Sequence, residues 1–223
     1  MMTSLDVTAG HDVVPPLTHV VMVRHGETEW NRDGRVQGMQ DSRLSERGLA
    51  QAEAVARVLA GESVDLIYSS DLGRTRQTAA AIARATGIEV RLDARLRERC
   101  YGVLEARTWT EIEREHPQAF QRLNARDPHY APAGGESPIV FRERVVQVFD
   151  EIAQAHLGAR IVVVSHGGVV GVMYRHVMEM SIEEKRRYAL FNASINRFRY
   201  VDARWHLDVW GDVSHLDGLL PDD

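Results

Sequence analysis

Residues 18–31 read THVVMVRHGETEWN, and the architecture of the chain follows from this stretch. Its first six residues, 18–23, are β-branched and apolar, which predicts a short strand buried on both faces. The triplet RHG at residues 24–26 follows without a linker. A similar arrangement returns later, where the apolar run at residues 161–164 leads directly into SHGG at residues 165–168. Two expected strands therefore end next to a histidine that is followed by glycine.

Other periodic segments alternate with these two strands. Further strands are expected at residues 64–68 and 88–92, with a terminal hairpin at 195–201 and 205–209. Helices are expected at residues 46–60, 71–85, 137–157 and 167–178. Ser45 and Asp71 are the expected N-caps of the first two helices. Leu49 and Val140 are assigned to the buried faces of the first and third helices.

This alternation indicates a fold class. Strands that alternate with helices imply a three-layer α/β/α fold, whose mostly parallel central sheet is covered on both faces. In such sheets, ligands bind beyond the carboxyl ends of the strands. His25 and His166 each follow a predicted strand closely, so both are expected at that edge.

The chain is expected to form a single domain at residues 18–213. Residues 1–17 are interpreted as a flexible leader and residues 214–223 as an acidic tail. The periodicity loosens between about residues 100 and 138, where only short helices at 109–116 and 117–126 are expected. We interpret this stretch as a helical insertion that forms a wall or lid over the site.

Composition excludes several classes of function. The formal net charge of −5 gives the whole molecule no electrostatic footprint for nucleic acid. Cys100 is the only cysteine, so it supports neither a disulfide framework nor a metal site, and a cytoplasmic location is expected. No uncharged apolar run reaches the ~18 residues of a membrane-spanning helix. Lys185 is the only lysine among 27 basic residues.

Four blocks of the sequence contain the residues suited to chemistry. The first block, residues 24–45, contains Arg24, His25, Asn31, Gln37 and Gly38. The second, residues 69–79, reads SSDLGRTRQTA and contains Arg74, and the third, residues 165–168, contains His166 and Gly167. The fourth, residues 96–105, reads LRERCYGVLE and contains Glu98, Arg99 and Tyr101.

Together these blocks are similar to the signature of the histidine phosphatase superfamily, the phosphoglycerate-mutase-like phosphatases and mutases, over about residues 20–196. The resemblance implies that His25 takes up the phosphoryl group as phosphohistidine. It implies catalytic roles for His166 and for Glu98 as the proton donor, with Glu105 and Glu111 as rival carboxyl groups. It assigns the remaining site residues to phosphate or substrate binding: Arg24, Asn31, Gln37, Gly38, Arg74, Arg99, Tyr101 and Gly167.

The residue types suit this chemistry. A neutral imidazole is a competent nucleophile, and its attack splits one difficult displacement into two easier ones. Guanidinium groups clamp phosphate oxygens with paired N–H donors. The neighbouring arginines are also expected to lower the pKa of His25 and keep its ring unprotonated at neutral pH. Because arginines supply the positive charge, neither a metal ion nor another cofactor is expected.

Three functions remain open: a phosphatase, a mutase and a non-catalytic phosphoryl-binding protein. A mutase resembling the cofactor-dependent phosphoglycerate mutases would require 2,3-bisphosphoglycerate. Glu98, Arg99 and Tyr101 match the Glu-Arg-x-Tyr-Gly of those enzymes, but the lysine that follows it there is absent. The GES sequence at residues 135–137 is similar to the phosphatase branch. Hydrolysis of a small phosphomonoester is therefore the expected function, and the oligomeric state, a homodimer included, is left open.

Overall fold

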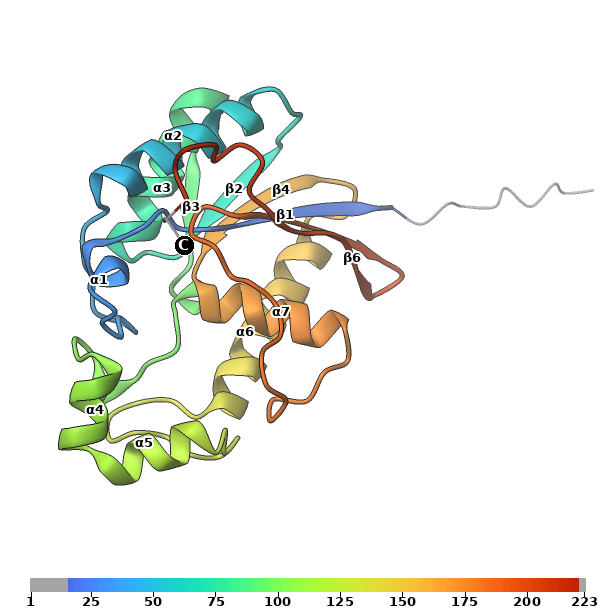
Figure 1. Cartoon of the computed structure of the whole chain (residues 1–223). Helices are drawn as coiled ribbons and strands as arrows, with labels where there is room; N and C mark the ends of the chain where they lie inside the picture. The colour runs from blue at the N-terminus through green and yellow to red at the C-terminus, as the bar shows by residue number, and fades with distance from the viewer. Residues whose placement is uncertain (1–15, 221–223) are drawn as a thin grey trace, which may run out of the picture.

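The computed structural model describes residues 16–220, which are built around one six-stranded sheet (Figure 1). Its strands lie in the order β3-β2-β4-β1-β5-β6. Their bounds are Thr18–Arg24 for β1, Leu66–Ser69 for β2, Val90–Leu92 for β3, Arg160–Ser165 for β4, Ile195–Val201 for β5 and Arg204–Asp212 for β6. The first four strands are parallel, and β5 and β6 add an antiparallel hairpin at one edge. Most of the leader expected at residues 1–17 lies outside the described residues.

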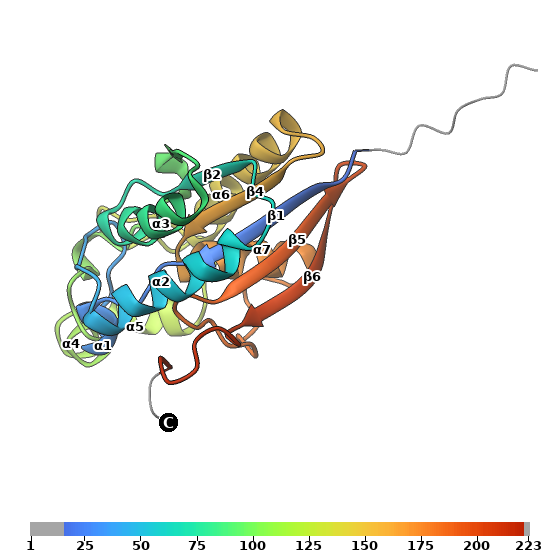
Figure 2. The same ribbon diagram turned by 90° about the horizontal axis from the view of Figure 1, so that it is seen from above.

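Helices cover both faces of the sheet, as Figure 2 shows from above. One face carries α2 (Glu46–Ala60) and α3 (Gly73–Thr86), and the other carries α6 (Pro138–Ala155) and α7 (Gly167–Val177). Alternate residues of β1 point into the two cores: Val21 and Val23 towards α2 and α3, Val20 and Met22 towards α6 and α7. The expected three-layer α/β/α arrangement is therefore confirmed. Within residues 16–220, no helix is both long and apolar enough to cross a bilayer.

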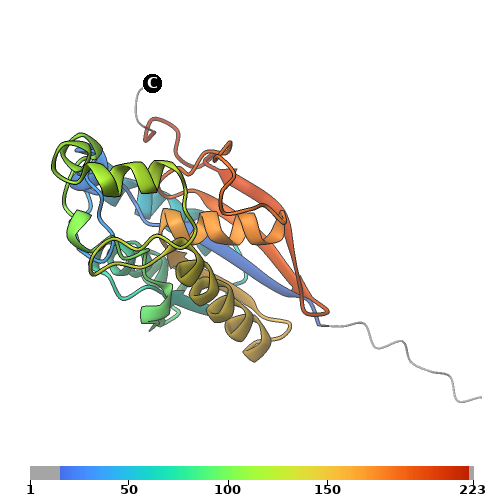
Figure 3. The same cartoon turned by 90° about the horizontal axis from the view of Figure 1, so that it is seen from below.

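The segment after β3 leaves the sheet and carries two short 3₁₀ turns, at Ala94–Leu96 and Gly102–Leu104. The helices α4 (Trp109–Glu115) and α5 (Pro117–Asn124) follow, and Figure 1 shows both lying clear of the sheet. Figure 3, the view from below, shows α6 and α7 on the near face of the sheet. Thr108 caps α4, with Glu111 completing a capping box. A β-bridge between Arg35 and Thr108 ties this segment to the loop after the short helix α1 (Glu29–Arg32).

Two apolar side chains were assigned to the wrong face of their helices. Leu49 is 51% exposed and Val140 is 52% exposed. The buried face of α2 centres on Gly48 and Leu59, and Leu49 is turned about 100° away from Gly48. Apolar residues occupy much of the circumference of α6, so the sequence does not single out its buried face. Val140 lies on the side away from the buried Val145.

The expectation that Asp71 caps α3 is wrong. The N-cap is Leu72, which supplies no side-chain hydrogen bond, and Asp71 instead accepts two hydrogen bonds from Arg97, at 2.6 and 2.5 Å. The cap comes from another part of the chain. Asp41 accepts hydrogen bonds from the backbone N–H groups of Gly73 and Arg74 at the start of the helix. The N-terminus of α3 is therefore tied to the loop that follows α1.

The end of the chain returns to the core beside α2. Leu216 is fully buried in the core that α2 and α3 share with the sheet. Gln51 donates a hydrogen bond to the carbonyl of Leu219 at 2.8 Å and accepts one from Glu27 N at 2.8 Å. One buried side chain therefore joins this segment to the loop directly after β1.

That loop also depends on a close approach of two backbones, which can be tested. A Cβ on Gly48 would overlap the Glu27 carbonyl oxygen, and a Cβ on Gly26 would overlap the Gly48 carbonyl. We expect Gly48→Ala to lower the free energy of unfolding by about 1–3 kcal/mol or more, because backbone cannot yield as a side chain can. The measurement is urea denaturation followed by circular dichroism.

Gly61→Ala, at the other end of the same helix, is the matched control. Its Cβ would meet nothing closer than the Val58 carbonyl at 3.4 Å, so this variant should lie within about 0.5 kcal/mol of the wild type. Equal stability of the two variants would contradict the close approach of α2 to residues 26–27.

Candidate active site

Nearly all the predicted site residues converge at the carboxyl end of β1. A cavity of about 200 Å³ is lined by most of them: Arg24, His25, Asn31, Gln37, Gly38, Arg74, Glu98, Tyr101 and Gly167. His166 lies directly behind His25, with the two ring centres 5.4 Å apart. Arg99 is the exception, since it lines a larger neighbouring cavity. The four sequence blocks therefore meet at one place.

His25 is held in a defined tautomer at the end of β1. Its side chain is only 3% exposed, and its Nδ1 lies 2.8 Å from the carbonyl oxygen of Gly26. Since a carbonyl can only accept, Nδ1 carries the proton and Nε2 has a free lone pair. Burial, followed by the charges of Arg74 and Arg24, holds the pKa of His25 well below its usual range. The ring is therefore neutral at neutral pH, as expected from the sequence, although burial contributes more than the arginines.

His166 is buried beside it, after β4. Its Nε2 lies 2.8 Å from the hydroxyl of Ser70, a residue that received no individual role from the sequence. Its Nδ1 is buried and has no hydrogen-bond partner within the described residues. Burial is the main reason that the pKa of His166 also lies well below the usual range, and the charge of Arg74 lowers it further. The second histidine is thus a neutral ring with one nitrogen unpaired.

Arg74 is the most completely buried cation of the site, at 1% exposed. Its terminal nitrogens donate to the carbonyls of Gln40 and Gly38 at 2.7 and 2.8 Å, and to Asp41 Oδ1 at 3.0 Å. These contacts fix the guanidinium plane and leave its Nε buried without a partner among the described residues. Asp41 was not assigned a role from the sequence, yet it orients both α3 and this arginine.

Arg24 is arranged in a similar way on β1. One terminal nitrogen donates to the carbonyl of Leu190, and its Nε is buried without a partner within residues 16–220. Loss of contact with water lowers the pKa of Arg24 to about 10, against the opposing effect of Glu98. Both arginines therefore remain charged at neutral pH, each with an unpaired N–H donor.

Glu98 is anchored by two backbone groups. Its Oε1 accepts from Arg99 N at 2.9 Å, and its Oε2 accepts from Gly168 N, in the first turn of α7, at 2.8 Å. A Cβ on Gly168 would overlap this carboxyl group and force it to move. Glu98 is therefore held with its carboxyl group beside the start of α7.

The rival carboxyl groups have structural partners instead. Glu105 accepts from the backbone N–H groups of Met39, Gln40 and Tyr101, and Glu111 completes the cap of α4 and pairs with Arg35. Neither lines the small cavity. Of the three carboxyl groups considered from the sequence, only Glu98 lies beside His25, Arg24 and Arg74.

Asn31 and Gln37 differ in how they relate to the site. Asn31 Oδ1 accepts from Thr28 N at 3.2 Å and from Asn192 Nδ2 at 3.2 Å, and Asn192 also donates to the His25 carbonyl at 3.0 Å. This oxygen is therefore used to hold the loop after His25. Gln37 is buried and its Oε1 has no partner among the described residues.

Arg99 was expected to bind substrate, but its donors are directed elsewhere. Its Nε donates to the carbonyl of Glu136 at 2.8 Å and its Nη2 to the carbonyl of Tyr130 at 3.2 Å, while its guanidinium lies 5.0 Å from the centre of the Tyr101 ring. It thus joins the two ends of the insertion. Tyr101 does line the small cavity, and it also faces the larger one.

The combined arrangement is suited to a tetrahedral dianion. Three buried nitrogen atoms, on Arg24, Arg74 and His166, have no hydrogen-bond partner among the described residues. Arg24 and Arg74 line the same cavity as His25, and the His166 ring lies next to the His25 ring. The N-terminus of α7 adds backbone donors and a partial positive charge at Gly167. Within residues 16–220, no group of three or more His, Cys, Asp or Glu side chains is placed to hold a metal ion.

Comparison with known proteins agrees with this geometry. The chain is 39% identical over 206 residues to the metal-independent phosphoserine phosphatase of Arabidopsis thaliana, covering 91% of this chain and 85% of that one. It is 38% identical over 213 residues to a probable phosphoglycerate mutase, GpmB, of Escherichia fergusonii, covering 93% and 99%. The solved structure of Bacillus stearothermophilus YhfR matches with a TM-score of 0.84 at 31% identity, covering 89% and 99%. The family model of the histidine phosphatase superfamily, branch 1, matches residues 20–213, and the chain belongs to that family.

Proposed function

We propose that the chain hydrolyses small phosphomonoesters through a phosphohistidine on His25, with Glu98 as the proton donor. One observation carries this proposal. The unprotonated Nε2 of a neutral, buried imidazole belongs to a cavity lined by two charged guanidinium groups, each with an N–H that has no partner within residues 16–220. Such a site can bind a phosphoryl dianion and attack it.

In the first step, Nε2 of His25 attacks phosphorus and the bond to the ester oxygen breaks. Arg24, Arg74 and the N-terminus of α7 stabilise the three phosphoryl oxygens, and donors fixed before reaction do this without reorganisation. The leaving oxygen takes a proton from the carboxyl group of Glu98 and departs as an alcohol. Nδ1 keeps its hydrogen bond to the Gly26 carbonyl, which stabilises the positive charge that forms on the ring.

In the second step, water attacks the phosphohistidine. Glu98, now a carboxylate, accepts a proton from that water, the bond between phosphorus and Nε2 breaks, and inorganic phosphate leaves. Glu98 and His25 then return to their starting protonation states. No step uses a metal ion, in keeping with a relative that is named as metal-independent.

The relatives' names include both a phosphatase and a probable mutase, and two observations favour hydrolysis. The lysine that follows Glu98, Arg99 and Tyr101 in the mutases is absent, and the GES sequence at residues 135–137 is similar to the phosphatase branch. The residues needed for chemistry are all in place, which disfavours a protein that only binds phosphoryl ligands. We therefore assign hydrolysis as the main activity. Hydrolysis does not require 2,3-bisphosphoglycerate. We also place the enzyme in the cytoplasm.

The nucleophile can be tested by replacing His25 with alanine. Without Nε2 there is no atom to carry the phosphoryl group, so turnover should fall by at least about ten-thousand-fold. After a rapid alkaline quench, intact mass spectrometry should show the phosphorylated wild type and no phosphorylated His25→Ala. His206→Ala removes an exposed histidine of β6 and is the matched control. Phosphohistidine in the His25→Ala variant would overturn the assignment.

The proton donor predicts a dependence on the leaving group. Glu98→Gln cannot donate a proton, so kcat/KM for an alkyl phosphate should fall by about 10²–10⁴-fold. For p-nitrophenyl phosphate, whose leaving group needs no proton, the loss should be much smaller. Glu111→Gln, with its carboxyl group on α4, serves as the control and should not separate the two substrates. An equal loss on both esters in Glu98→Gln would show that Glu98 does not protonate the leaving group.

The choice between water and a second substrate as phosphoryl acceptor requires a paired assay. Phosphate release is measured on a panel of phosphomonoesters, and interconversion of 2- and 3-phosphoglycerate is measured with added bisphosphoglycerate. We expect phosphate release to be the faster process by at least about tenfold, since the lysine that the mutases carry after this motif is absent. Rapid interconversion with little release of phosphate would favour the mutase.

A further inference from the structure

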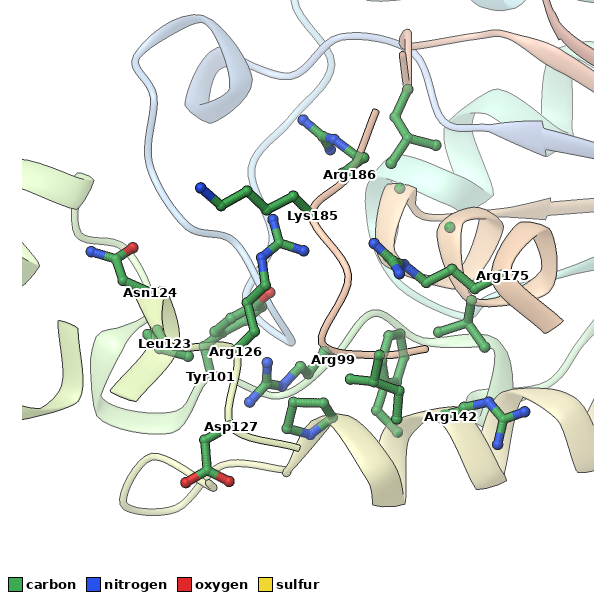
Figure 4. A pocket seen from close by; sticks show the side chains of 18 of the residues that line it. Arg99, Tyr101, Leu123, Asn124, Arg126, Asp127, Arg142, Arg175, Lys185 and Arg186 are labelled. Carbon is green, nitrogen blue, oxygen red and sulfur yellow. The ribbon is translucent and has the colours of Figure 1, made fainter. Parts of the chain in front are cut away.

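A second, larger cavity lies beside the catalytic one (Figure 4). Its volume is about 790 Å³, against about 200 Å³ for the cavity at His25. Tyr101, Trp109 and Gly167 line both cavities, so the two are neighbours along that border. A volume of about 300–1,000 Å³ is typical of sites for small organic molecules. The larger cavity therefore offers more room than a phosphoryl group requires.

Its lining is strongly basic. Six cationic side chains face it: Arg99, Arg126, Arg142, Arg175, Lys185 and Arg186. The one acidic residue of the lining, Asp127, is paired with Arg122. Among residues 16–220, none of the six cations has a carboxylate oxygen within 4.0 Å. The chain as a whole carries a net charge of −5, so this concentration of unneutralised positive charge is local.

Backbone contacts hold two of these cations in place. Arg126, after α5, donates to the Glu184 carbonyl at 2.5 Å, and Arg175, on α7, donates to the same carbonyl at 2.8 Å and to that of Ser181 at 2.5 Å. The segment that carries Lys185 is thereby tied to both the insertion and α7. Carbonyl groups accept hydrogen bonds but do not cancel a charge, so both guanidinium groups remain cationic.

The acidic side chains of this segment do not offset the cations. Glu184 turns back on its own loop, where its Oε1 accepts from Ser181 N at 2.8 Å. Neither Glu183 nor Glu184 lines the cavity. Lys185 and Arg186, the next two residues, do. Figure 4 shows them with Arg126 and Arg175 around one open space, supplied by three separate parts of the chain.

The larger cavity lies on the side from which a leaving group would depart. A proton donor must stand next to the leaving oxygen, and Glu98 is held by the N–H groups of Arg99 and Gly168. Both of those residues line the larger cavity. Arg186 is also close enough to Arg24 for its charge to lower the pKa of that arginine. The basic lining therefore begins next to the phosphoryl site and extends away from it.

We propose that the substrate is a phosphomonoester with a large leaving group that carries at least one further anionic group, bound by Arg126, Arg175, Lys185 and Arg186. The inference rests on the proposed phosphatase function and specifies its substrate class. The aromatic side chains of Tyr101, Trp109 and Tyr188 supply apolar surface for the body of that leaving group. A second phosphate or a carboxylate has the charge that four unneutralised cations recognise.

Matched pairs of esters separate size from charge in the test. AMP is compared with its counterpart that has a second phosphate monoester on the ribose, and phosphoethanolamine is compared with phosphoserine, which adds only a carboxylate. We expect the highest kcat/KM for the larger, doubly charged ester. Its advantage over AMP should shrink as salt is raised, because exposed charges are screened.

The variant Lys185→Gln/Arg186→Gln should reduce the ratio of kcat/KM between the two adenosine esters by about 10–100-fold, since it removes two of the four cations that hold the second anionic group. Arg160→Gln/Arg204→Gln removes the same charge from exposed arginines of β4 and β6 and should leave that ratio unchanged. An unchanged ratio in the first variant, or no preference for the doubly charged ester in the wild type, would overturn the inference.

A binding measurement distinguishes failure of the inference from failure of the proposed function. Calorimetry of the larger bisphosphate on His25→Ala, with and without the two glutamine substitutions, needs no turnover. If no ester is hydrolysed but binding still depends on Lys185 and Arg186, the phosphatase function fails and the anion site stands. If esters are hydrolysed without regard to charge, the reverse holds. Tighter, competing binding of an oligonucleotide or an acidic peptide would overturn the assignment to a small-molecule leaving group.

Discussion

The site depends on the parallel pairing of β1 with β4. Their register sets Val23 opposite Val164 and Arg24 opposite Ser165, so that the two strands end level with each other. The backbone N–H of His25 then donates to the Ser165 carbonyl at 3.0 Å, and the two histidine rings that follow meet edge to face. A shift of one residue in this pairing would turn alternate side chains to the opposite face of the sheet and separate His25 from His166. Hydrophobic packing on both faces of the sheet fixes this register, and the register sets how His25 and His166 lie relative to each other.

A second constraint is electrostatic. Arg24 and Arg74 are enclosed next to two histidines, and neither guanidinium is fully paired with carboxylates. Removing charged groups from water opposes folding, and the carbonyls that surround each arginine compensate for only part of that loss. An anion that binds between them relieves the remainder and stabilises the native state by mass action. The same two buried arginines therefore lower the stability of the protein without an anion and attract a phosphate group.

Much of this could be read from the sequence, because the signals are local. The apolar runs that end in RHG and SHGG predict strands. Because His25 and His166 follow those strands, both are predicted to lie at the carboxyl edge of the sheet. The misses involve contacts between distant segments. Asp41 rather than Asp71 caps α3, and Ser70 pairs with His166. Periodicity also misplaced Leu49, since the first turn of α2 packs through Gly48 against backbone. The basic cavity is lined by the insertion, by α7 and by the loop that contains Lys185. These segments lie far apart in the sequence, so no local pattern predicts the cavity.

The place of β1 within the sheet has a consequence for how the molecule is made. This strand is synthesised before every other strand of the sheet, yet its neighbours β4 and β5 begin at residues 160 and 195. Its N–H and C=O groups cannot form their sheet hydrogen bonds until nearly the whole domain has left the ribosome. Pairings of such long sequence separation form slowly, and the exposed apolar strand is open to aggregation until they do. Gln51 extends this dependence, because its contact with Leu219 forms only after all six strands of the sheet have been made. The nucleophile is therefore translated early but acquires its final environment only after nearly all of the domain has been made.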